Sequence, residues 1–342
     1  MIVYENNNIK IIKYDTIKDV PNTWDSIIGD NIYMSKKFIS FMENIDKCNQ
    51  KYYMIYENDE LDTIFMTYVR KKYNLGMFTK INLVQKITMI YVPLSVTRPG
   101  IIYNKHLETA FNYIKTLKGP KMILNIGDYH PDNYAKGLTC PKCIFYNKFK
   151  TFDEYIDSLR SNYRHRYKNA LKKSNELTLE FLEDNKNFTE EMYDCYLQVY
   201  NKSRIRIEKL SIDFFRGDFF KIFTLKNKEK VVGFCQLIEN GKELIFEFVG
   251  VDYKYNNLYD TYHRILLEIV RYGIENGFET IDFGQTADES KLKLGSKYTY
   301  LYVYLHHSNK LINAFNKKFA KMLEYKPIKT DYNVFKTINK DN

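Results

Sequence analysis

The sequence repeats one pattern in its two halves, and this repeat limits the folds that are open to it. Residues 56–69 (YENDELDTIFMTYV) and 225–238 (LKNKEKVVGFCQLI) both read as strand, Asn-containing turn, Glu and strand. Further along each half, an amphipathic helix, a Gly-bearing turn and a short apolar strand end at Gly127 or Gly284. Chance similarity in a chain rich in Asn, Ile and Tyr is the alternative. Otherwise the repeat predicts two copies of one α/β unit.

Length and composition agree with two units. A chain of 342 residues exceeds what one hydrophobic core usually serves, and 44% hydrophobic and 16% aromatic residues supply material for two. We predict an α+β fold of two tandem units, each a mixed, mainly antiparallel sheet flanked by helices. The stretch 131–143 (PDNYAKGLTCPKC) lacks periodicity and is typical of a linker. The predicted domains are therefore 1–148 and 149–342.

The second half gives the clearer order of elements. A helix is predicted from Thr151, with Glu154 completing a capping box, and its apolar residues keep helical spacing to Leu171. A second helix, three strands, a long helix ended by Gly277 and two further strands follow. In residue numbers these elements are 190–203, 219–225, 230–238, 243–251, 258–277, 278–284 and 298–305.

Several classes of protein are disfavoured by composition. No apolar run approaches the ~20 residues that span a membrane, and the first residues lack a signal-peptide layout, so we expect a cytoplasmic protein. An odd count of five cysteines indicates reduced thiols. Cys140 and Cys143 in CPKC could serve zinc or redox chemistry, but no second ligand pair accompanies them, and we predict no metal site. The net charge of +10 admits nucleic acid, an acidic carrier protein or a phosphate-bearing cofactor.

Two stretches carry a resemblance to a known family. Residues 155–173 (YIDSLRSNYRHRYKNALKK) resemble the Arg-rich opening helix of Fem-type transferases and of BioF2-like acetyltransferase-domain proteins, within the Gcn5-related N-acetyltransferase (GNAT) superfamily. Residues 259–295 resemble their closing helix, the strand ending in Asp-Phe-Gly and a lysine-x-x-x-glycine segment. The resemblance covers residues 151–305 and, more faintly, 24–128. It implies two tandem GNAT-like units, the second of them catalytic.

The resemblance implies a role for Lys291, which occupies the place of the family's active-site lysine. A cation there can neutralise phosphate or a developing oxyanion. Lys293, two residues on, would point to the opposite side of an extended segment. The alternative is a solvated loop with ordinary lysines.

Two carboxylates are candidate catalytic groups. Related acetyltransferases often hold their base on the fourth strand, where Glu247 lies among large apolar residues that raise a carboxyl pKa. Strict alternation of the strand would put Glu247 on one face with Ile245 and Val249. A solvent-facing edge residue is the alternative. Asp282 is the second candidate, although an Asp there can simply cap the following loop.

The donor site departs from simpler acetyltransferases, which cradle the coenzyme A pyrophosphate in a glycine-rich turn. The matching segment here, 252–264 (DYKYNNLYDTYHR), has no glycine, which puts standard coenzyme A binding in doubt. Tyr259, His263, Arg264 and Lys293 could supply side-chain contacts instead. The plainer interpretation makes Tyr259 a core residue and His263 an exposed helical one.

Three arginines are candidates for binding substrate. Arg164 belongs to a stripe of cations that recurs every four residues on the opening helix, and the alternative is the water-facing side of that helix. Arg204 and Arg206 lie where the family's acceptor groove would run.

Three functions follow from these features. The first is an N-acyltransferase that moves an acyl group from acyl-CoA or an acyl carrier protein to a small-molecule or peptide amine, without a permanently bound cofactor. The second uses aminoacyl-tRNA as donor, as in the peptidoglycan-bridge enzymes, although the long coiled-coil arm that several of them carry is missing. The third is a non-catalytic binding module on the same fold.

Overall fold

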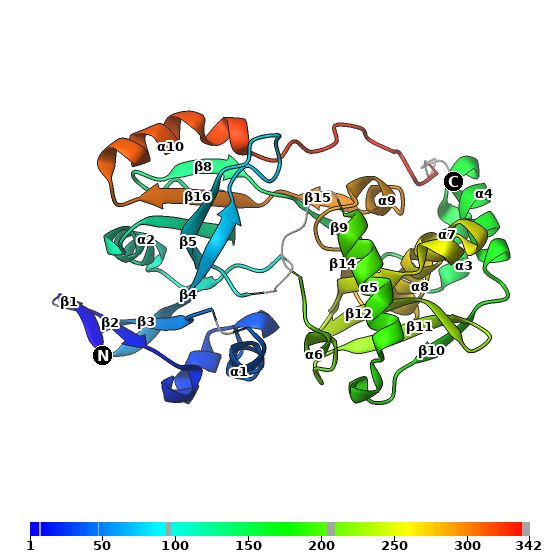
Figure 1. Cartoon of the computed structure of the whole chain (residues 1–342), viewed down its shortest axis with the longest axis horizontal. Coiled ribbons are helices and arrows are strands. Elements are labelled where there is room, and N and C mark those ends of the chain that lie inside the picture. Colours follow the sequence, from blue (N-terminus) through cyan, green and yellow to red (C-terminus); the bar gives the residue numbers. More distant parts are fainter. Residues whose placement is uncertain (7, 47, 94–96, 204–208, 337–342) are drawn as a thin grey trace, which may run out of the picture. The chain divides into compact units, whose positions relative to one another are not determined.

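The computed structural model describes residues 1–6, 8–46, 48–93, 97–203 and 209–336 (Figure 1). The chain forms two compact units: 1–141 together with 300–327, and 142–299 together with the segment that starts at Ile328. Both units combine a mixed, mainly antiparallel sheet with flanking helices, so the predicted α+β class is confirmed.

The first unit is built on one sheet whose strands run in the order β1-β2-β3-β4-β5-β7-β16-β8, with β6 paired to β4. β5 and β7 pair in parallel, and the other pairs among the described residues of this sheet are antiparallel. The strands are β1 (Ile2–Asn6), β2 (Ile9–Tyr14), β3 (Lys51–Glu57), β4 (Glu60–Asn74), β5 (Val84–Ile90), β6 (Ile101–Tyr103), β7 (Pro120–Ile126), β8 (Ala135–Leu138) and β16 (Tyr302–His307).

Three helices accompany this sheet: α1 (Lys36–Ile45), α2 (Leu107–Thr116) and α10 (Lys310–Leu323). Short 3-10 turns lie at Ile17–Asp19, Asn22–Ser26 and Ile32–Met34. The buried face of α2 packs Phe111 and Ile114 against Phe65 and Tyr304, which forms the core of this unit.

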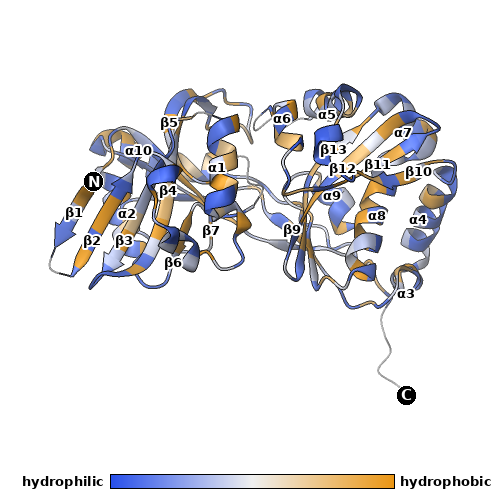
Figure 2. Cartoon of the chain, turned by 90° about the horizontal axis from the view of Figure 1, so that it is seen from below, coloured by the Kyte–Doolittle hydropathy of each residue, from blue (hydrophilic) through white to orange (hydrophobic). Residues whose placement is uncertain are grey.

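The second unit has the strand order β10-β11-β12-β13-β14-β9-β15, with β13 and β14 in parallel. Its strands are β9 (Lys142–Tyr146), β10 (Thr178–Phe181), β11 (Lys221–Asn227), β12 (Lys230–Asn240), β13 (Glu243–Val251), β14 (Thr280–Asp282) and β15 (Lys297–Thr299). Its helices are α3 (Phe152–Ser158), α4 (Ser161–Lys173), α5 (Glu190–Lys202), α6 (Ile212–Phe215), α7 (Tyr253–Tyr259), α8 (Thr261–Glu275) and α9 (Asp288–Leu292), with a 3-10 turn at Asn185–Asn187. Figure 2 shows α8 and α4 on one face of the sheet and α5 and α6 on the other.

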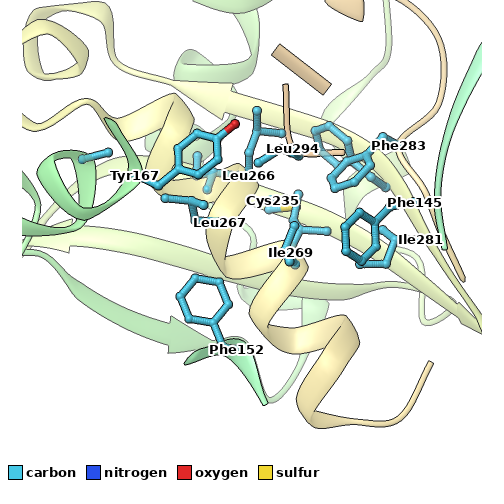
Figure 3. Close-up of a cluster of buried hydrophobic side chains, with 14 of the residues drawn as sticks. Phe145, Phe152, Tyr167, Cys235, Leu266, Leu267, Ile269, Ile281, Phe283 and Leu294 are labelled. Carbon is cyan, nitrogen blue, oxygen red and sulfur yellow. The ribbon is translucent and has the colours of Figure 1, made fainter. Parts of the chain in front are cut away.

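The main core of the second unit lies between the sheet and α3, α4 and α8 (Figure 3). α8 buries large aliphatic residues on both sides of Glu268, including Leu266, Leu267 and Ile269, so its central turns are apolar on more than one side. The apolar stripe predicted from Thr151 to Leu171 packs into this core. The Thr151 hydroxyl accepts the Glu154 backbone N–H, whereas the Glu154 carboxylate accepts the backbone N–H of Lys150 rather than that of Thr151, so the predicted capping box forms only in part.

The internal repeat is confirmed by the topology. In each unit a tight hairpin, β3–β4 or β11–β12, is followed by a strand that pairs in parallel with the strand after the main helix. That helix is α2 in the first unit and α8 in the second. The turns of the two hairpins, 58–59 and 228–229, have left-handed residues at Asn58, Asp59 and Lys228.

The predicted domain boundary differs from the structure because the chain crosses between the units three times, after residues 141, 299 and 327. β9 begins at Lys142 and opens the second sheet. The run 298–305, expected as one strand, is two: β15 pairs with β9, whereas β16 pairs with β7 and β8 and returns the chain to the first unit. The expected linker 131–143 is wrong as well, since it contains β8.

The opening helix of the second unit is also not continuous. α3 ends at Ser158, and Leu159 is extended and forms a bridge with Phe335 before α4 begins at Ser161. The apolar spacing continues across this break, which is why the sequence predicts one helix. Among the described helices, none is both long and apolar enough to cross a bilayer.

Candidate active site

Glu247 lies where two parallel strands separate. β13 and β14 pair from Glu243↔Thr280 to Ile245↔Asp282, and the pairing ends there, two residues before Glu247. On the other side of β13, Phe246 faces Leu237 and Phe248 faces Gln236, so Glu247 is the extra residue of a β-bulge. Bulges redirect side chains and are frequent beside active sites.

The bulge overturns the strict alternation that the sequence predicts for this strand. The ring of Phe246 lies 6.3 Å from that of Phe283, on the side of the main core. The ring of Phe248 instead meets Tyr196 and Phe214, on the side of α5 and α6. Two residues that alternation puts on one face therefore lie on opposite faces, and the change of phase occurs at Glu247.

Glu247 is a buried carboxyl group. It is 6% exposed, and neither of its oxygens has a hydrogen-bond partner among the described residues. Burial, and after it the negative charge of Asp282, raise the pKa of Glu247 well above the ordinary 4.5. The solvent-facing alternative is therefore wrong. A desolvated carboxyl with unused lone pairs suits proton transfer near neutral pH.

Asp282 ends β14 and is fully buried. One carboxylate oxygen accepts the backbone N–H of Gly284 at 2.8 Å, and the other accepts the Lys142 ammonium at 3.2 Å. Asp282 therefore caps the loop that follows it, and it also keeps a negative charge near Glu247. Sequence reasoning missed Lys142, because the strand that carries it was assigned to a linker.

Lys291 is buried, and its segment is helical rather than extended. It lies in α9, is 3% exposed and donates from Nζ to the carbonyl of Gln285 at 2.7 Å. Its Nζ lies 5.7 Å from the ring centre of Phe246, the residue before Glu247. The alternative of a solvated loop is thus wrong for Lys291, and the ammonium belongs to the region of the two carboxylates.

Lys293 has a different environment. It follows α9 and forms an ion pair with Glu289 at 2.5 Å, and its Nζ lies 5.2 Å from the ring centre of Tyr332. Residues two apart on a helix point about 200° apart. The side chains of the two lysines therefore point in opposite directions, as predicted, but the segment is a helix and not the extended chain that the prediction assumed.

The loop that leads to α9 is strained. Gly284, Thr286 and Ala287 all have left-handed backbones, with φ of 69°, 64° and 50°. Positive φ is rare for a β-branched residue such as Thr, and such strain concentrates at functional sites. This loop presents the Gln285 carbonyl to Lys291. Thr and Ala are not turn-forming residues, so no sequence signal marks this conformation.

Cys143 and Asp288 complete the surroundings of Lys291. Burial raises the pKa of the Cys143 thiol to about 12, while Lys291 lowers it and Asp288 raises it, so these groups are close neighbours. The Tyr298 hydroxyl donates to Asp288 at 2.7 Å. CPKC thus supplies a neutral, buried thiol. The described residues contain no cluster of three groups able to hold a metal, and none of the cysteines forms a disulfide.

The segment without glycine is a helix and not a phosphate-binding turn. α7 spans Tyr253–Tyr259, and Asp260 in a left-handed conformation joins it to α8. Tyr259 is a buried core residue whose hydroxyl accepts from Asn227 at 2.7 Å. His263 lies between Asp260 at 2.7 Å and the Arg166 guanidinium at 2.9 Å. Because a guanidinium can only donate, His263 accepts at Nε2 and carries its proton at Nδ1, toward Asp260.

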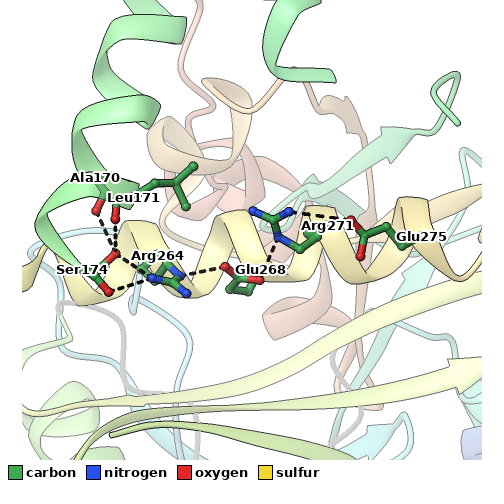
Figure 4. Close-up of polar contacts among 7 residues, drawn as sticks. All are labelled: Ala170, Leu171, Ser174, Arg264, Glu268, Arg271 and Glu275. Carbon is green, nitrogen blue, oxygen red and sulfur yellow. Dashed lines mark hydrogen bonds and ion pairs between the residues drawn. The ribbon is translucent and has the colours of Figure 1, made fainter. Parts of the chain in front are cut away.

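Arg264 joins α8 to the end of α4 (Figure 4). Its Nη1 donates to the carbonyl and hydroxyl of Ser174 at 2.8 and 3.0 Å, and its Nε donates to Glu268 at 2.7 Å. Glu268 also accepts from Arg271 at 3.2 Å. Arg264 therefore donates a hydrogen bond to a carbonyl that has no partner within its own helix, at the C-terminus of α4, and this role is structural.

Of the three arginines expected to bind substrate, the described residues include Arg164 alone. Arg164 is half-buried on α4. Arg204 and Arg206 lie outside the described residues. The structure brings Glu247, Asp282 and Lys291 together, whereas Tyr259 and Arg264 contact β11 and α4.

Comparisons with known proteins agree with this fold. Residues 157–292 match the family model of the acetyltransferase (GNAT) domain. The crystal structure of FemX superposes with a TM-score of 0.51 at 11% identity, over 89% of this chain and 99% of that one. A conserved protein of unknown function from Bacteroides thetaiotaomicron gives 0.52 at 10% identity, over 86% and 99%. No curated protein sequence matches the chain.

Most of the C-terminal unit therefore matches an acetyltransferase (GNAT) domain, and this match supports an enzyme of the acyltransferase class. The whole chain has the Fem-type fold of two GNAT-like units.

Proposed function

We propose that the protein is an N-acyltransferase that moves an acyl group from a thioester, either acyl-CoA or an acylated carrier protein, to an amine. The main support for this proposal is the environment of the Glu247 carboxyl group. It is a buried carboxyl without a partner among the described residues, its pKa is raised, and it lies on a bulge where β13 leaves β14. The acceptor is a small-molecule or peptide amine.

The proposed chemistry needs a base and a cation. Glu247 removes a proton from the acceptor ammonium, and the free amine attacks the thioester carbonyl to form a C–N bond. Collapse of the tetrahedral intermediate breaks the C–S bond, and the proton that the attacking nitrogen loses passes to the leaving thiolate. Lys291 stabilises the oxyanion, because an ammonium fixed in a dry site interacts strongly with developing negative charge. Asp282 raises the pKa of Glu247 and so makes it the stronger base.

The donor is proposed to bind through side chains rather than through a backbone cradle, since α7 stands where the glycine turn would be. His263 and Lys293 are the proposed contacts for its phosphates. Arg264 and Tyr259 support that region from within through their contacts to Ser174 and Asn227. Arg164, Arg204 and Arg206 stay proposed contacts for substrate.

The test is thiol release from a panel of acyl-CoAs and acylated carrier proteins incubated with amine acceptors. The proposal expects amide formation, by mass spectrometry, with at least one pair, and its loss in Glu247→Gln. A panel that yields no thiol above the uncatalysed rate contradicts it.

A second candidate donor is aminoacyl-tRNA, which the helical α7 favours because such a donor needs no pyrophosphate cradle. Binding of tRNA through phosphates weakens steeply with salt. A gel-shift titration at two salt concentrations tests this donor, and binding that is absent or insensitive to salt rejects it.

A further inference from the structure

Helix α10 presents an apolar stripe to solvent. Leu311 is 82% exposed, and Phe315 and Met322 are each 59% exposed. Together with Phe319 they recur at the spacing of a single helical stripe. The opposite side of the helix, with Asn313 and Ala320, is buried against β16 and β8 of the same unit. α10 therefore packs one side against the sheet and leaves an apolar stripe on the other side exposed to solvent. Figure 1 shows the helix beside β16 and β8.

The charges on α10 are all positive. Its charged residues are Lys310, Lys317, Lys318 and Lys321, with no Asp or Glu from Lys310 to Leu323. At 100° per residue these lysines lie in a strip beside the exposed apolar stripe. The Lys318 Nζ lies 5.8 Å from the ring centre of Phe319, so its stem follows the apolar surface while its charge reaches outward.

The neighbouring connection between β4 and β5 has the same character. Ile81 and Leu83 in this connection, and Val84 at the start of β5, are each nearly half exposed. The ring of Phe78, in this connection, lies 5.4 Å from that of Tyr325, just after α10, so the connection adjoins the end of that helix. No acidic residue occurs between Asp62 and Glu108.

We propose that α10, together with the connection between β4 and β5, binds flat to the surface of a bilayer that contains anionic lipids. The apolar stripe enters the boundary between headgroups and acyl chains, and the lysines beside it meet lipid phosphates. A protein partner fits less well, because protein interfaces are depleted in lysine, which is the only cation on this helix. The proposal goes beyond the acyltransferase activity, which requires no membrane.

The test is co-sedimentation of the full chain with vesicles of phosphatidylcholine alone and of phosphatidylcholine mixed with phosphatidylglycerol. Binding is expected to the mixed vesicles only, and to weaken with salt. Leu311→Ser with Phe315→Ser is expected to weaken it at least about tenfold. Each neutralised lysine among Lys317, Lys318 and Lys321, changed to Gln, weakens it about fivefold.

Leu258→Ser is the matched control, because Leu258 is 61% exposed and lies in α7, which belongs to the second unit. It should bind vesicles as the unchanged chain does. All the altered side chains are exposed, so circular dichroism spectra should coincide. Absent vesicle binding, or binding that the α10 variants retain, overturns the proposal. A dimer that Phe315→Ser converts to monomer also overturns it, because the stripe then covers a second copy. Vesicle binding needs no catalysis, so this result is independent of the proposed activity.

Discussion

At the scale of single residues, the account depends on Glu247 being a buried acid in the folded state. A carboxyl whose folded pKa is raised binds its proton more tightly when folded than when unfolded. Its contribution to stability is therefore full below the ordinary pKa of 4.5 and is lost as the pH rises through the folded value. At neutral pH the buried carboxylate costs stability.

Glu247→Gln should remove this dependence, because the amide does not titrate. We expect the free energy of unfolding of the variant, relative to the unchanged chain, to increase as the pH rises above about 4.5. Urea unfolding at several pH values measures it. Curves that stay parallel across that range would show that Glu247 has an ordinary pKa.

The two lysines of the α9 segment should behave differently. Lys291→Met keeps the volume of the buried side chain but removes its charge, and we expect kcat to fall about 10²–10³-fold. Lys293→Ala, which breaks an ion pair with Glu289 and removes a proposed contact for the donor phosphates, should raise KM for the donor and change kcat by less than about threefold. Steady-state kinetics with one donor separates them. Equal losses would assign both lysines to binding rather than to catalysis.

At the scale of elements, Arg264 should act through packing. Arg264→Ala leaves the Ser174 carbonyl without its charged donor and weakens the pairing of the buried Glu268, so we expect a loss of about 2–3 kcal/mol in the free energy of unfolding. Lys168→Ala, whose ion pair with Asp157 is exposed and 3.9 Å long, is the control and should be nearly neutral. Thermal and urea unfolding give the comparison. A stable Arg264→Ala with a large rise in KM for the donor would instead make it a donor contact.

The helices and strands of the second unit were largely predictable from sequence, because the apolar residues within each of them follow helical or strand spacing. The strand ELIFEFVGV matches β13 at both ends, and Gly277, with φ of 74°, follows α8 as expected. The predictions that were wrong concern features that depend on tertiary contacts. The break at Leu159 needs its bridge to Phe335, and the bulge at Glu247 needs the register with β12. The family pattern identified the site residues Lys291, Glu247 and Asp282, and the apolar neighbours of Glu247 also indicated its burial, whereas no sequence signal indicated the burial of Lys291.

At the scale of the whole molecule, each sheet contains a strand that the predicted boundary assigns to the other domain. These strands are β9 in the second sheet and β16 in the first. A break in an apolar run such as YTYLYVYL leaves no local signal, since β15 and β16 are equally strand-like. Only the strands with which they pair show that β15 belongs to the second unit and β16 to the first.

This arrangement predicts that the first unit requires the segment 300–327. A chain ending at residue 299 lacks β16, which lies between β7 and β8, and so exposes an unpaired strand on each side of the gap. We expect it to aggregate on expression, whereas a chain ending at residue 336 should unfold like the full one. Limited proteolysis and thermal unfolding provide the readout. A soluble, protected first unit without β16 would contradict the topology.

The central claim is that the buried carboxyl of Glu247 takes the proton in an acyl transfer. The most direct measurement is the pH dependence of kcat/KM for a donor and amine found active, compared between the unchanged chain and Glu247→Gln. We expect a rising limb with an apparent pKa well above 4.5, and its disappearance in the variant together with a fall of about 10²–10⁴-fold in rate. A variant with the same profile and the same rate would contradict the claim.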